Sequence, residues 1–571
     1  MGGKQVGKKS LPKYLALAIT LLLIACGQLW GSPDRTGTGS SSLNIFTTAS
    51  LTPFQPELSM PAPSATASSS PEEPSRTPIP TTLWISPAIP EKLRQLALSS
   101  GLLQTDDQVA ANVLLDVSRS SSGEPATWIY ALVAPFPTTT DDVSIKTIQA
   151  AWAGQASGPF ASRPFWMTAS TLAAFSAIWG APASGSVNVV EADQLVDSAW
   201  AARPAWAIVP FETLEPRWKV LSVDGQSPVH NDFNPNAYPL KINFDLQPAV
   251  FPLLSSNRDP TKLTVLAMTG TTALVRGTAD RMESHGVLYP GEEIRTVLRS
   301  ADLTHVSNEV PFYAGCPTPD QWTISLRFCS DPRYIALLED IGVDIVELTG
   351  NHELDYGVAP MLTTLDMYDQ RGWLHFGGGR NLADAIQAAK VTQNGNKLAF
   401  LGCNQHGPES DWATDTSPGT APCDYEQMKT EIASLLSQGY LPIVTFQYNE
   451  YYQNIPTDYE RRDFQLMVDA GAIIVSGSQA HMPAAMEFYE GSFIHYGLGN
   501  LFFDQMSIQL NNGTIIYDTR NVFVDRHIFY DGRYVGTELL TYIIEDYARP
   551  RQMNDTERTQ FLQSIFSAAG W

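Results

Sequence analysis

The stretch Glu347-Leu-Thr-Gly-Asn-His-Glu-Leu-Asp-Tyr-Gly357 decides how the fold of this chain is interpreted. Before it, Asp331-Pro332 is a favourable helix start, because Asp can cap free N–H groups and Pro fits the first turn. Apolar residues then recur at helical spacing, Gly342 is a suitable stop, and Val343–Leu348 has the composition of a buried strand. The segment Gly350-Asn351-His352 therefore falls just past a strand end, where open α/β sheets tend to place their ligands.

Three side chains of this stretch have types that suit chemistry. The carbonyl of Asn351 can ligate a metal, His352 can give or take a proton near neutral pH, and Asp355 can orient that histidine. We predict His352 and Asp355 as a catalytic pair. The alternatives are a turn role for Asn351 and a structural hydrogen bond between His352 and Asp355.

Length and charge limit the classes of protein that fit. The chain has 571 residues, enough for several domains with substantial cores. Its net charge is 36 minus 59, or −23. Since phosphate backbones are bound by basic patches, so acidic a chain is not expected to bind nucleic acid.

Residues 1–26 have the pattern of an export signal. A lysine-rich start precedes the apolar run Tyr14–Ala25, which is shorter than the ~20 residues needed to span a bilayer. The run ends in Leu23-Ile24-Ala25-Cys26, which resembles a bacterial lipobox. That resemblance implies cleavage before Cys26, lipidation of its thiol and anchoring at the outer face of the cell membrane. The alternative is an uncleaved N-terminal anchor.

Residues 27–82 are rich in Ser, Thr and Pro. Such a composition buries too little apolar surface to offset the loss of conformational entropy on ordering. We therefore predict a disordered tether that separates a globular body from the membrane.

The cysteines fit an exported protein. If Cys26 carries lipid, Cys316, Cys329, Cys403 and Cys423 remain, and an oxidising compartment can pair them. Four cysteines allow three pairings; we favour Cys316–Cys329 and Cys403–Cys423, each of which closes a local loop. A four-cysteine zinc site is the alternative, although neither gap has the spacing of two to four residues typical of such sites.

Residues 83–250 are expected to form a smaller α/β domain, because helix-like and strand-like stretches alternate there. Three runs resemble the periplasmic phosphate- and solute-binding proteins: Leu83–Pro87, Trp206–Phe211 and Lys219–Gly225. No Gly-rich phosphate loop accompanies them. A solute receptor and a lobe that binds nothing both stay open.

Residues 260–549 alternate strands and helices in the pattern of a layered α/β domain, and residues 550–571 read as one terminal helix. Seven blocks in this region stand in a fixed order: Leu263–Arg276, Ala301–Glu309, Ala336–Gly357, Gly377–Ala385, Lys397–Gly402, Ile443–Asn449 and Asp469–Asp504.

These ordered blocks resemble the CapA family of bacterial capsule or poly-γ-glutamate synthesis proteins. The last block includes Tyr496-Gly-Leu-Gly-Asn-Leu-Phe-Phe-Asp504, which looks like the family segment Tyr-x-x-Gly-Asn-x-x-Phe-Asp. The resemblance implies an α-β-β-α sandwich like that of calcineurin-type metallophosphoesterases. It also implies a role in synthesis, export or attachment of an anionic cell-surface polymer such as polyglutamate, with the capsule-synthesis machinery as partner.

The resemblance further implies a site for divalent metal (Mn, Zn or Fe), in which two cations activate water and clamp a phosphoryl oxygen. Carried over by position, the ligands of one metal would be Glu309, Asn351 and His481. Neutral side chains stand where the family pattern has Asp or His, at Thr271, Gln447 and Gln479. Two interpretations follow: a metal-dependent hydrolase with a degenerate site, or a catalytically inactive surface protein that binds polymer or solute.

Overall fold

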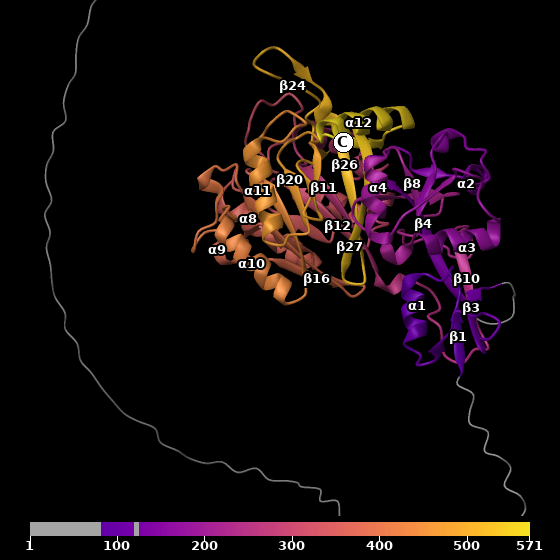
Figure 1. Ribbon diagram of the computed structural model, residues 1–571. Coiled ribbons are helices and arrows are strands. Elements are labelled where there is room, and N and C mark those ends of the chain that lie inside the picture. Colours follow the sequence, from indigo (N-terminus) through magenta and orange to yellow (C-terminus); the bar gives the residue numbers. More distant parts are fainter. Residues whose placement is uncertain (1–80, 119–124) are drawn as a thin grey trace, which may run out of the picture. The chain divides into compact units, whose positions relative to one another are not determined.

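The computed structural model describes residues 81–118 and 125–571 (Figure 1). The predicted signal peptide, the lipidation of Cys26 and nearly all of the tether 27–82 lie outside these residues. Within the two described stretches, no helix combines the length and the apolar character needed to cross a bilayer.

The first part of the described chain builds a ten-stranded sheet around the long strand β4 (Ala126–Pro135). Nine of the ten residues of β4 are buried, and the strand pairs with β8, β9 and β10. The other strands are β1 (Thr82–Ile85), β2 (Leu103–Gln104), β3 (Val113–Val117), β5 (Asp142–Val143), β6 (Phe165–Met167), β7 (Val187–Val189), β8 (Trp206–Pro210), β9 (Trp218–Val223) and β10 (Lys241–Gln247).

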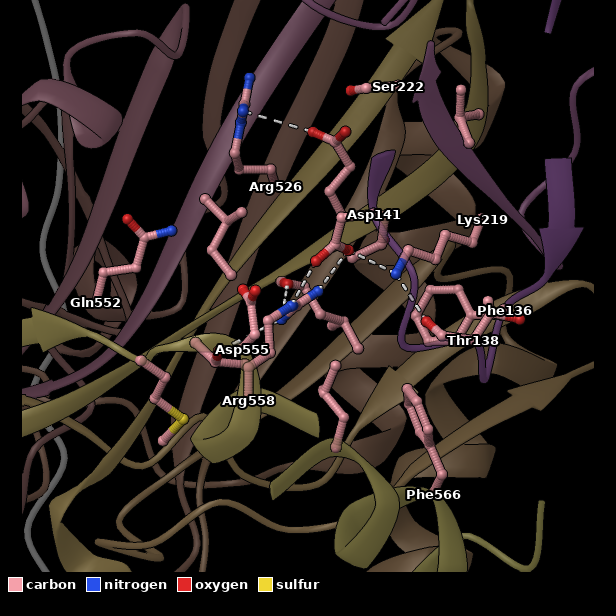
Figure 2. A pocket seen from close by; sticks show the side chains of 18 of the residues that line it. Phe136, Thr138, Asp141, Lys219, Ser222, Arg526, Gln552, Asp555, Arg558 and Phe566 are labelled. Atoms are coloured by element: carbon pink, nitrogen blue, oxygen red, sulfur yellow. Dashed lines mark hydrogen bonds and ion pairs between the residues drawn. The ribbon is translucent and has the colours of Figure 1, made fainter. Parts of the chain in front are cut away.

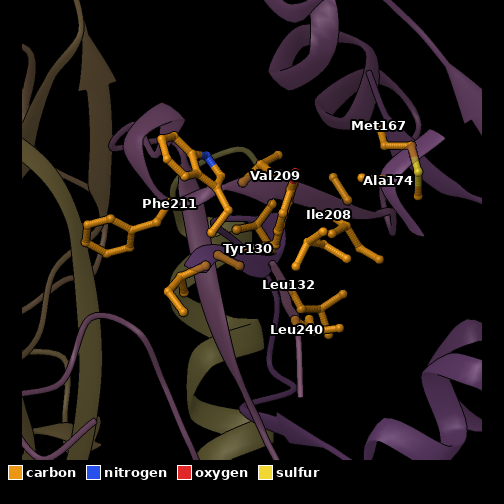
Figure 3. Close-up of a cluster of buried hydrophobic side chains, with 14 of the residues drawn as sticks. Tyr130, Leu132, Met167, Ala174, Ile208, Val209, Phe211 and Leu240 are labelled. Carbon is orange, nitrogen blue, oxygen red and sulfur yellow. The ribbon is translucent and has the colours of Figure 1, made fainter. Parts of the chain in front are cut away.

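Helices pack against this sheet and complete its core. Ser144 and Thr168 begin two of them, because each side chain accepts a hydrogen bond from a backbone N–H three residues later. In Figure 3, Tyr130 and Leu132 of β4 lie among side chains of β8 and neighbouring elements. The helices are α1 (Glu91–Leu98), α2 (Ile145–Trp152), α3 (Ala169–Trp179) and α4 (Leu195–Ala201). The expected α/β character of this part is confirmed.

From Leu263 onward, an eight-stranded and a six-stranded sheet form the centre of a sandwich. The eight-stranded sheet contains β11 (Leu263–Thr272), β12 (Leu303–Asn308), β13 (Ile345–Glu347), β14 (Leu374–Phe376), β23 (Asn500–Phe502), β26 (Asn521–Tyr530), β27 (Arg533–Glu545) and β28 (Arg549–Gln552). The six-stranded sheet contains β16 (Ala389–Gln393), β17 (Asn396–Asn404), β19 (Leu441–Gln447), β20 (Ile474–Ser478), β21 (Met486–Tyr489) and β22 (Ser492–His495).

Alternation along the strands places one face of each sheet against the other sheet. In β11, Leu266 and Met268 join the core shared with Phe400 and Ile443 of the second sheet, whereas Ala267 faces the helices. The first sheet is covered by α5 (Arg276–His285), α6 (Arg295–Leu298), α7 (Ile335–Ile341) and α8 (Val358–Arg371), and the second by α9 (Leu382–Ala385), α10 (Tyr425–Ser437) and α11 (Asp458–Asp469). The predicted α-β-β-α sandwich is confirmed.

The chain ends in α12 (Asp555–Ala568), which begins with a capping box between Asn554 and Glu557. Its apolar residues Leu562 and Phe566 belong to the core between the two sheets of the sandwich. Phe136, which follows β4, belongs to the same core, so the first part of the chain packs directly against the sandwich.

Both predicted disulfides are present. Cys316 and Cys329 have Cα atoms 5.8 Å apart, and Cys403 and Cys423 have Cα atoms 5.0 Å apart. The alternative of a four-cysteine zinc site is therefore wrong.

Candidate functional site

Strands of both sheets end at the same edge of the sandwich, and the predicted residues stand at those ends. The strands run parallel in the pairs β11–β12, β12–β13 and β19–β20, so their carboxyl ends align. Polar side chains, buried or half-buried, stand at these strand ends: Thr271 in β11, Glu309 after β12, Asn351 after β13, Gln447 in β19 and Gln479 after β20. This is the position that the helix–strand pattern before Asn351 predicts.

The amide of Gln447 joins side chains of the two sheets. Its Nε2 donates to Glu309 Oε1 at 3.2 Å and to Asn351 Oδ1 at 3.1 Å, and it also contacts Gln479 Oε1. Its Oε1 accepts a hydrogen bond of 2.8 Å from the hydroxyl of Ser478. Glu309 and Asn351 are thus brought together, with an amide N–H group between them.

His481 connects to this group through Glu450. The amide of Gln479 donates to Glu450 Oε1 at 2.9 Å, and the same oxygen lies 3.6 Å from Nε2 of His481. The other ring nitrogen of His481 lies 2.8 Å from Oδ1 of Asn500, on β23. Gln479 and His481 both have left-handed backbones, with φ of 77° and 52°. Such conformations cluster at functional sites, so this turn is a candidate for function.

His352 and Asp355 form the predicted pair, with Nδ1 of the histidine 2.8 Å from Oδ2 of the aspartate. Burial lowers the pKa of His352, but the hydrogen bond to Asp355 and the nearby charge of Glu309 outweigh it, so the pKa is raised above its usual value. The dyad therefore favours the imidazolium form, which can donate a proton.

Two further acids surround the dyad. Glu353 is fully buried, and among the described residues its carboxylate has no hydrogen-bond partner. Burial, with Glu309 and Asp411 adding repulsion, raises its pKa well above the usual value. Burial and the charge of Asp355 also raise the pKa of Asp411 to about 6. The dyad therefore lies beside two acids whose pKa values are raised above the usual range.

Several members of this site have weak sequence signals. Glu450 is exposed and contacts the site through Gln479, and its local sequence does not point to that role. Asn500 lies inside the quoted Tyr496–Asp504 segment, which could have pointed to it. Asp411 comes from the loop after β17, and nothing in its local sequence distinguishes it.

The side chains do not fit a two-metal centre. Such a centre needs carboxylates and imidazoles around each cation, and no group of three His, Cys, Asp or Glu that could hold a metal occurs in residues 81–118 and 125–571. The oxygens of Glu309 and Asn351 accept N–H groups from Gln447, and the buried hydroxyl of Thr271 has no partner in the described chain. Metal ligation by Glu309, Asn351 and His481 stays a prediction of the resemblance.

Comparison with known proteins identifies the segment that carries this site. Residues 265–505 match the family model described as bacterial capsule synthesis protein PGA_cap. This segment belongs to the PGA_cap family. The predicted resemblance to the CapA family is thereby confirmed for the PGA_cap segment, which contains every site residue named above.

Curated relatives of the PGA_cap segment carry matching names. The PGA biosynthesis protein CapA of Bacillus subtilis (strain 168) is 32% identical over 217 residues, which cover 37% of this chain and 56% of the relative. The capsule biosynthesis protein CapA of Bacillus anthracis is 24% identical over 254 residues, covering 44% and 62%. This chain therefore spans less than two thirds of the length of either relative.

Solved structures show only distant likeness. A 5'-nucleotidase precursor from Thermus thermophilus aligns with a TM-score of 0.30 and 15% identity, covering 53% of this chain and 58% of that one. An ABC-type phosphate transport receptor from Vibrio cholerae aligns with a TM-score of 0.23 and 12% identity, covering 29% of this chain and 84% of the receptor.

Proposed function

We propose that this protein takes part in making, exporting or attaching an anionic cell-surface polymer of the polyglutamate type, as a binding protein rather than a two-metal hydrolase. The family match of residues 265–505 and the names of the curated relatives support the role in producing such a polymer. One observation carries the second half of the proposal: the amide of Gln447 lies between the oxygens of Glu309 and Asn351.

That observation argues against metal-assisted hydrolysis for a chemical reason. Cations in a two-metal site are held by lone pairs, whereas an amide nitrogen presents N–H donors to the same oxygens. To bind a metal, Glu309 and Asn351 would have to give up these hydrogen bonds. They would also lack two ligands of the family pattern, because Thr271 stands in place of an aspartate and Gln479 in place of a histidine. We derive no step through a metal.

A cavity beside the dyad offers a binding surface for carboxylates. It has a volume of about 250 Å³, and Arg276 and Arg327 lie in its wall together with Phe328. The acid among its lining residues is Asp320. Because a guanidinium binds a carboxylate through two parallel hydrogen bonds, we assign the carboxylates of the polymer to this cavity.

The two arginines are held in different ways. Arg276 lies between the rings of Phe328 and Phe503, 4.9 Å from each centroid, and pairs with Asp504 at 2.5 Å. Arg327 is exposed and donates to the backbone carbonyl of Asp355. Arg276 is thus a fixed positive group, and Arg327 is the one that can be changed with little effect on folding.

A polymer-binding assay with matched variants tests the proposal. Poly-γ-glutamate of defined length is titrated into wild type, Arg327→Gln and Lys146→Gln, the last removing an exposed charge far along the chain. We expect binding in wild type and in Lys146→Gln, and at least tenfold weaker binding in Arg327→Gln. Equal affinity in all three proteins would rule out this cavity as the polymer site.

The competing hydrolase function has one supporting observation, the intact His352–Asp355 pair. Elemental analysis separates the two functions, with the triple variant Thr271→Asp/Gln447→His/Gln479→His as a positive control that restores the family ligands. We expect metal in the triple variant and none in wild type. About two metals per wild-type chain, with phosphodiesterase activity lost in His352→Ala, would establish the hydrolase instead.

We further propose that the protein is anchored at the outer face of the cell membrane through lipid on Cys26. The lipobox-like sequence Leu23–Cys26 supports this location, and the two disulfides fit an oxidising compartment. Cells expressing Cys26→Ser should release the protein from the membrane fraction and lose labelling by radioactive palmitate. Retention of both label and membrane association would contradict the lipid anchor.

A further inference from the structure

A second cavity lies where the first part of the chain packs against the sandwich. It has a volume of about 250 Å³ and lies among β9, β26, β27 and α12 (Figure 2). Part of its wall is apolar, with Phe136, Leu562 and Phe566. Charged side chains also line it: Asp141, Lys219, Arg526, Glu538 and Arg558, with Asp555 at an exposed position and His230 beside Glu538. The cavity thus combines an apolar side with a polar one.

One group of these charges is fully used within the protein. Asp141 accepts from Nζ of Lys219 at 2.6 Å and from two nitrogens of Arg558 at 2.6 and 2.8 Å. Arg558 also donates to the backbone carbonyl of Leu539 at 3.0 Å. These three side chains therefore hold α12 against the first sheet and have few donors left for a ligand.

Arg526 differs from them, and Figure 2 shows it apart from the Asp141 group. Its side chain is 9% exposed, and its buried Nε has no hydrogen-bond partner among the described residues. The acid nearest to it is Glu538, whose Oε2 lies 3.5 Å from Nη1. The other oxygen of Glu538 lies 2.8 Å from Nε2 of His230.

A buried N–H donor without a partner is unusual in a folded protein. A guanidinium carries five N–H donors, and a buried donor without an acceptor is unfavourable. Arg526 also lines a neighbouring cavity of about 420 Å³, where His230 and Ser300 are among its neighbours. The guanidinium therefore borders open space on two sides and can meet an acceptor that enters from either cavity.

The charges in the cavity balance overall but are unevenly placed. Three cations, Lys219, Arg526 and Arg558, face three acids, Asp141, Glu538 and Asp555, of which Asp555 lies at an exposed position. Asp141 pairs with Lys219 and Arg558, so Glu538 is the acid that faces Arg526, at 3.5 Å. A ligand carboxylate would supply two acceptors to the planar fork of Arg526.

We propose that this cavity binds a small organic carboxylate, with its carboxylate on Arg526 and its carbon skeleton against Phe136 and Phe566. The volume limits the ligand to a small metabolite, since drug-sized ligands occupy pockets of about 300–1,000 Å³. The site shares no residue with the cavity of Arg276 and Arg327, so this inference stands apart from the proposed function.

Thermal unfolding and calorimetric titration of the full chain test the proposal. The probes are L-glutamate, succinate and acetate. Inorganic phosphate is included to test whether any anion binds. Because a ligand that binds the folded state raises its stability, we expect at least one of the organic carboxylates to raise Tm of wild type by several degrees at saturation. In Arg526→Gln the affinity should fall at least tenfold, while Lys146→Gln keeps wild-type affinity.

A second variant distinguishes a loss of binding from a loss of folding. Arg526→Lys keeps the charge and removes the fork, so it should fold and bind with intermediate affinity. Wild type that gains no stability from any organic carboxylate would overturn the proposal, as would equal affinity in wild type and Arg526→Gln. Stabilisation by phosphate alone would overturn the ligand class.

Discussion

Nδ1 of His352 lies 2.8 Å from Oδ2 of Asp355, and that same oxygen accepts the backbone N–H of Phe328 at 2.6 Å. The ring of Phe328 also packs edge-on against the imidazole, with centroids 4.6 Å apart. Phe328 belongs to the loop that the disulfide Cys316–Cys329 closes. The dyad is therefore held in place by a loop that starts about forty residues earlier in the chain.

Replacing Asp355 with Asn should lower the pKa of His352. The hydrogen bond and the negative charge of Asp355 both favour the imidazolium, and the neutral amide supplies neither the charge nor an equally strong acceptor. NMR titration of the labelled histidine ring measures the change. Asp369→Asn is the matched control, because Asp369 contacts His375 and should leave His352 unchanged. An unaltered His352 titration in Asp355→Asn would show that Asp355 does not set this pKa.

The stability contributed by His352 should depend on pH with a defined sign. Its pKa is higher in the folded state than the usual 6.5, so the contribution is complete below about pH 6.5 and is lost as pH rises through the folded-state value. The loss in unfolding free energy caused by His352→Gln should therefore be larger at pH 5.5 than at pH 8.5, by about 1.4 kcal/mol for each pKa unit of the shift. Urea unfolding at the two pH values measures it, and a larger loss at the alkaline pH would contradict the raised pKa.

Removing the disulfide Cys316–Cys329 by Ser substitution should disturb the dyad as well as the fold. Freeing a loop of this length removes about 3 kcal/mol of stability in the chain-entropy model. Because the loop also carries Phe328, which covers the imidazole and donates to Asp355, the pKa of His352 should shift. Phe175→Ala is the control, because this buried residue belongs to the core of the first sheet; its loss should cost at least as much stability and leave His352 unchanged. Equal pKa shifts in the two variants would show that the effect is not local.

Local signals explain the parts of the fold that could be predicted. The helix before the motif begins with Asp331 capping Arg333 N, and it ends at Gly342 in a left-handed conformation. The strand Ile345–Glu347 follows as expected. Each disulfide joins cysteines at most 20 residues apart, so loop closure favoured the observed pairs. In each case the decisive interaction lies within a short stretch of sequence.

The rest of the site depends on contacts between distant segments. The amide of Gln447 donates to Glu309, which lies 138 positions earlier in the chain. The local sequence shows only that glutamine stands where the family pattern has histidine. Glu450 stands next to Tyr451 and Tyr452 in the sequence, but its carboxylate accepts a hydrogen bond from Gln479, 29 positions later. Arg526 sits in a buried strand, and alternation cannot indicate that its guanidinium faces open space. Only the packing of the two sheets determines these environments.

Gly270 stands beside the site residue Thr271, at the point where β11 meets β23. A Cβ atom added there would lie 1.9 Å from the backbone oxygen of Gly499, which accepts the N–H of Thr271. Because backbone atoms on both strands would have to move, we expect Gly270→Ala to reduce the unfolding free energy by at least about 3 kcal/mol. Gly536→Ala is the control, since its added Cβ would meet its nearest atom at 3.8 Å and should be tolerated. Chemical unfolding measures the free energy of both variants. Equal stability of the two would show that β11 and β23 do not approach so closely beside Thr271.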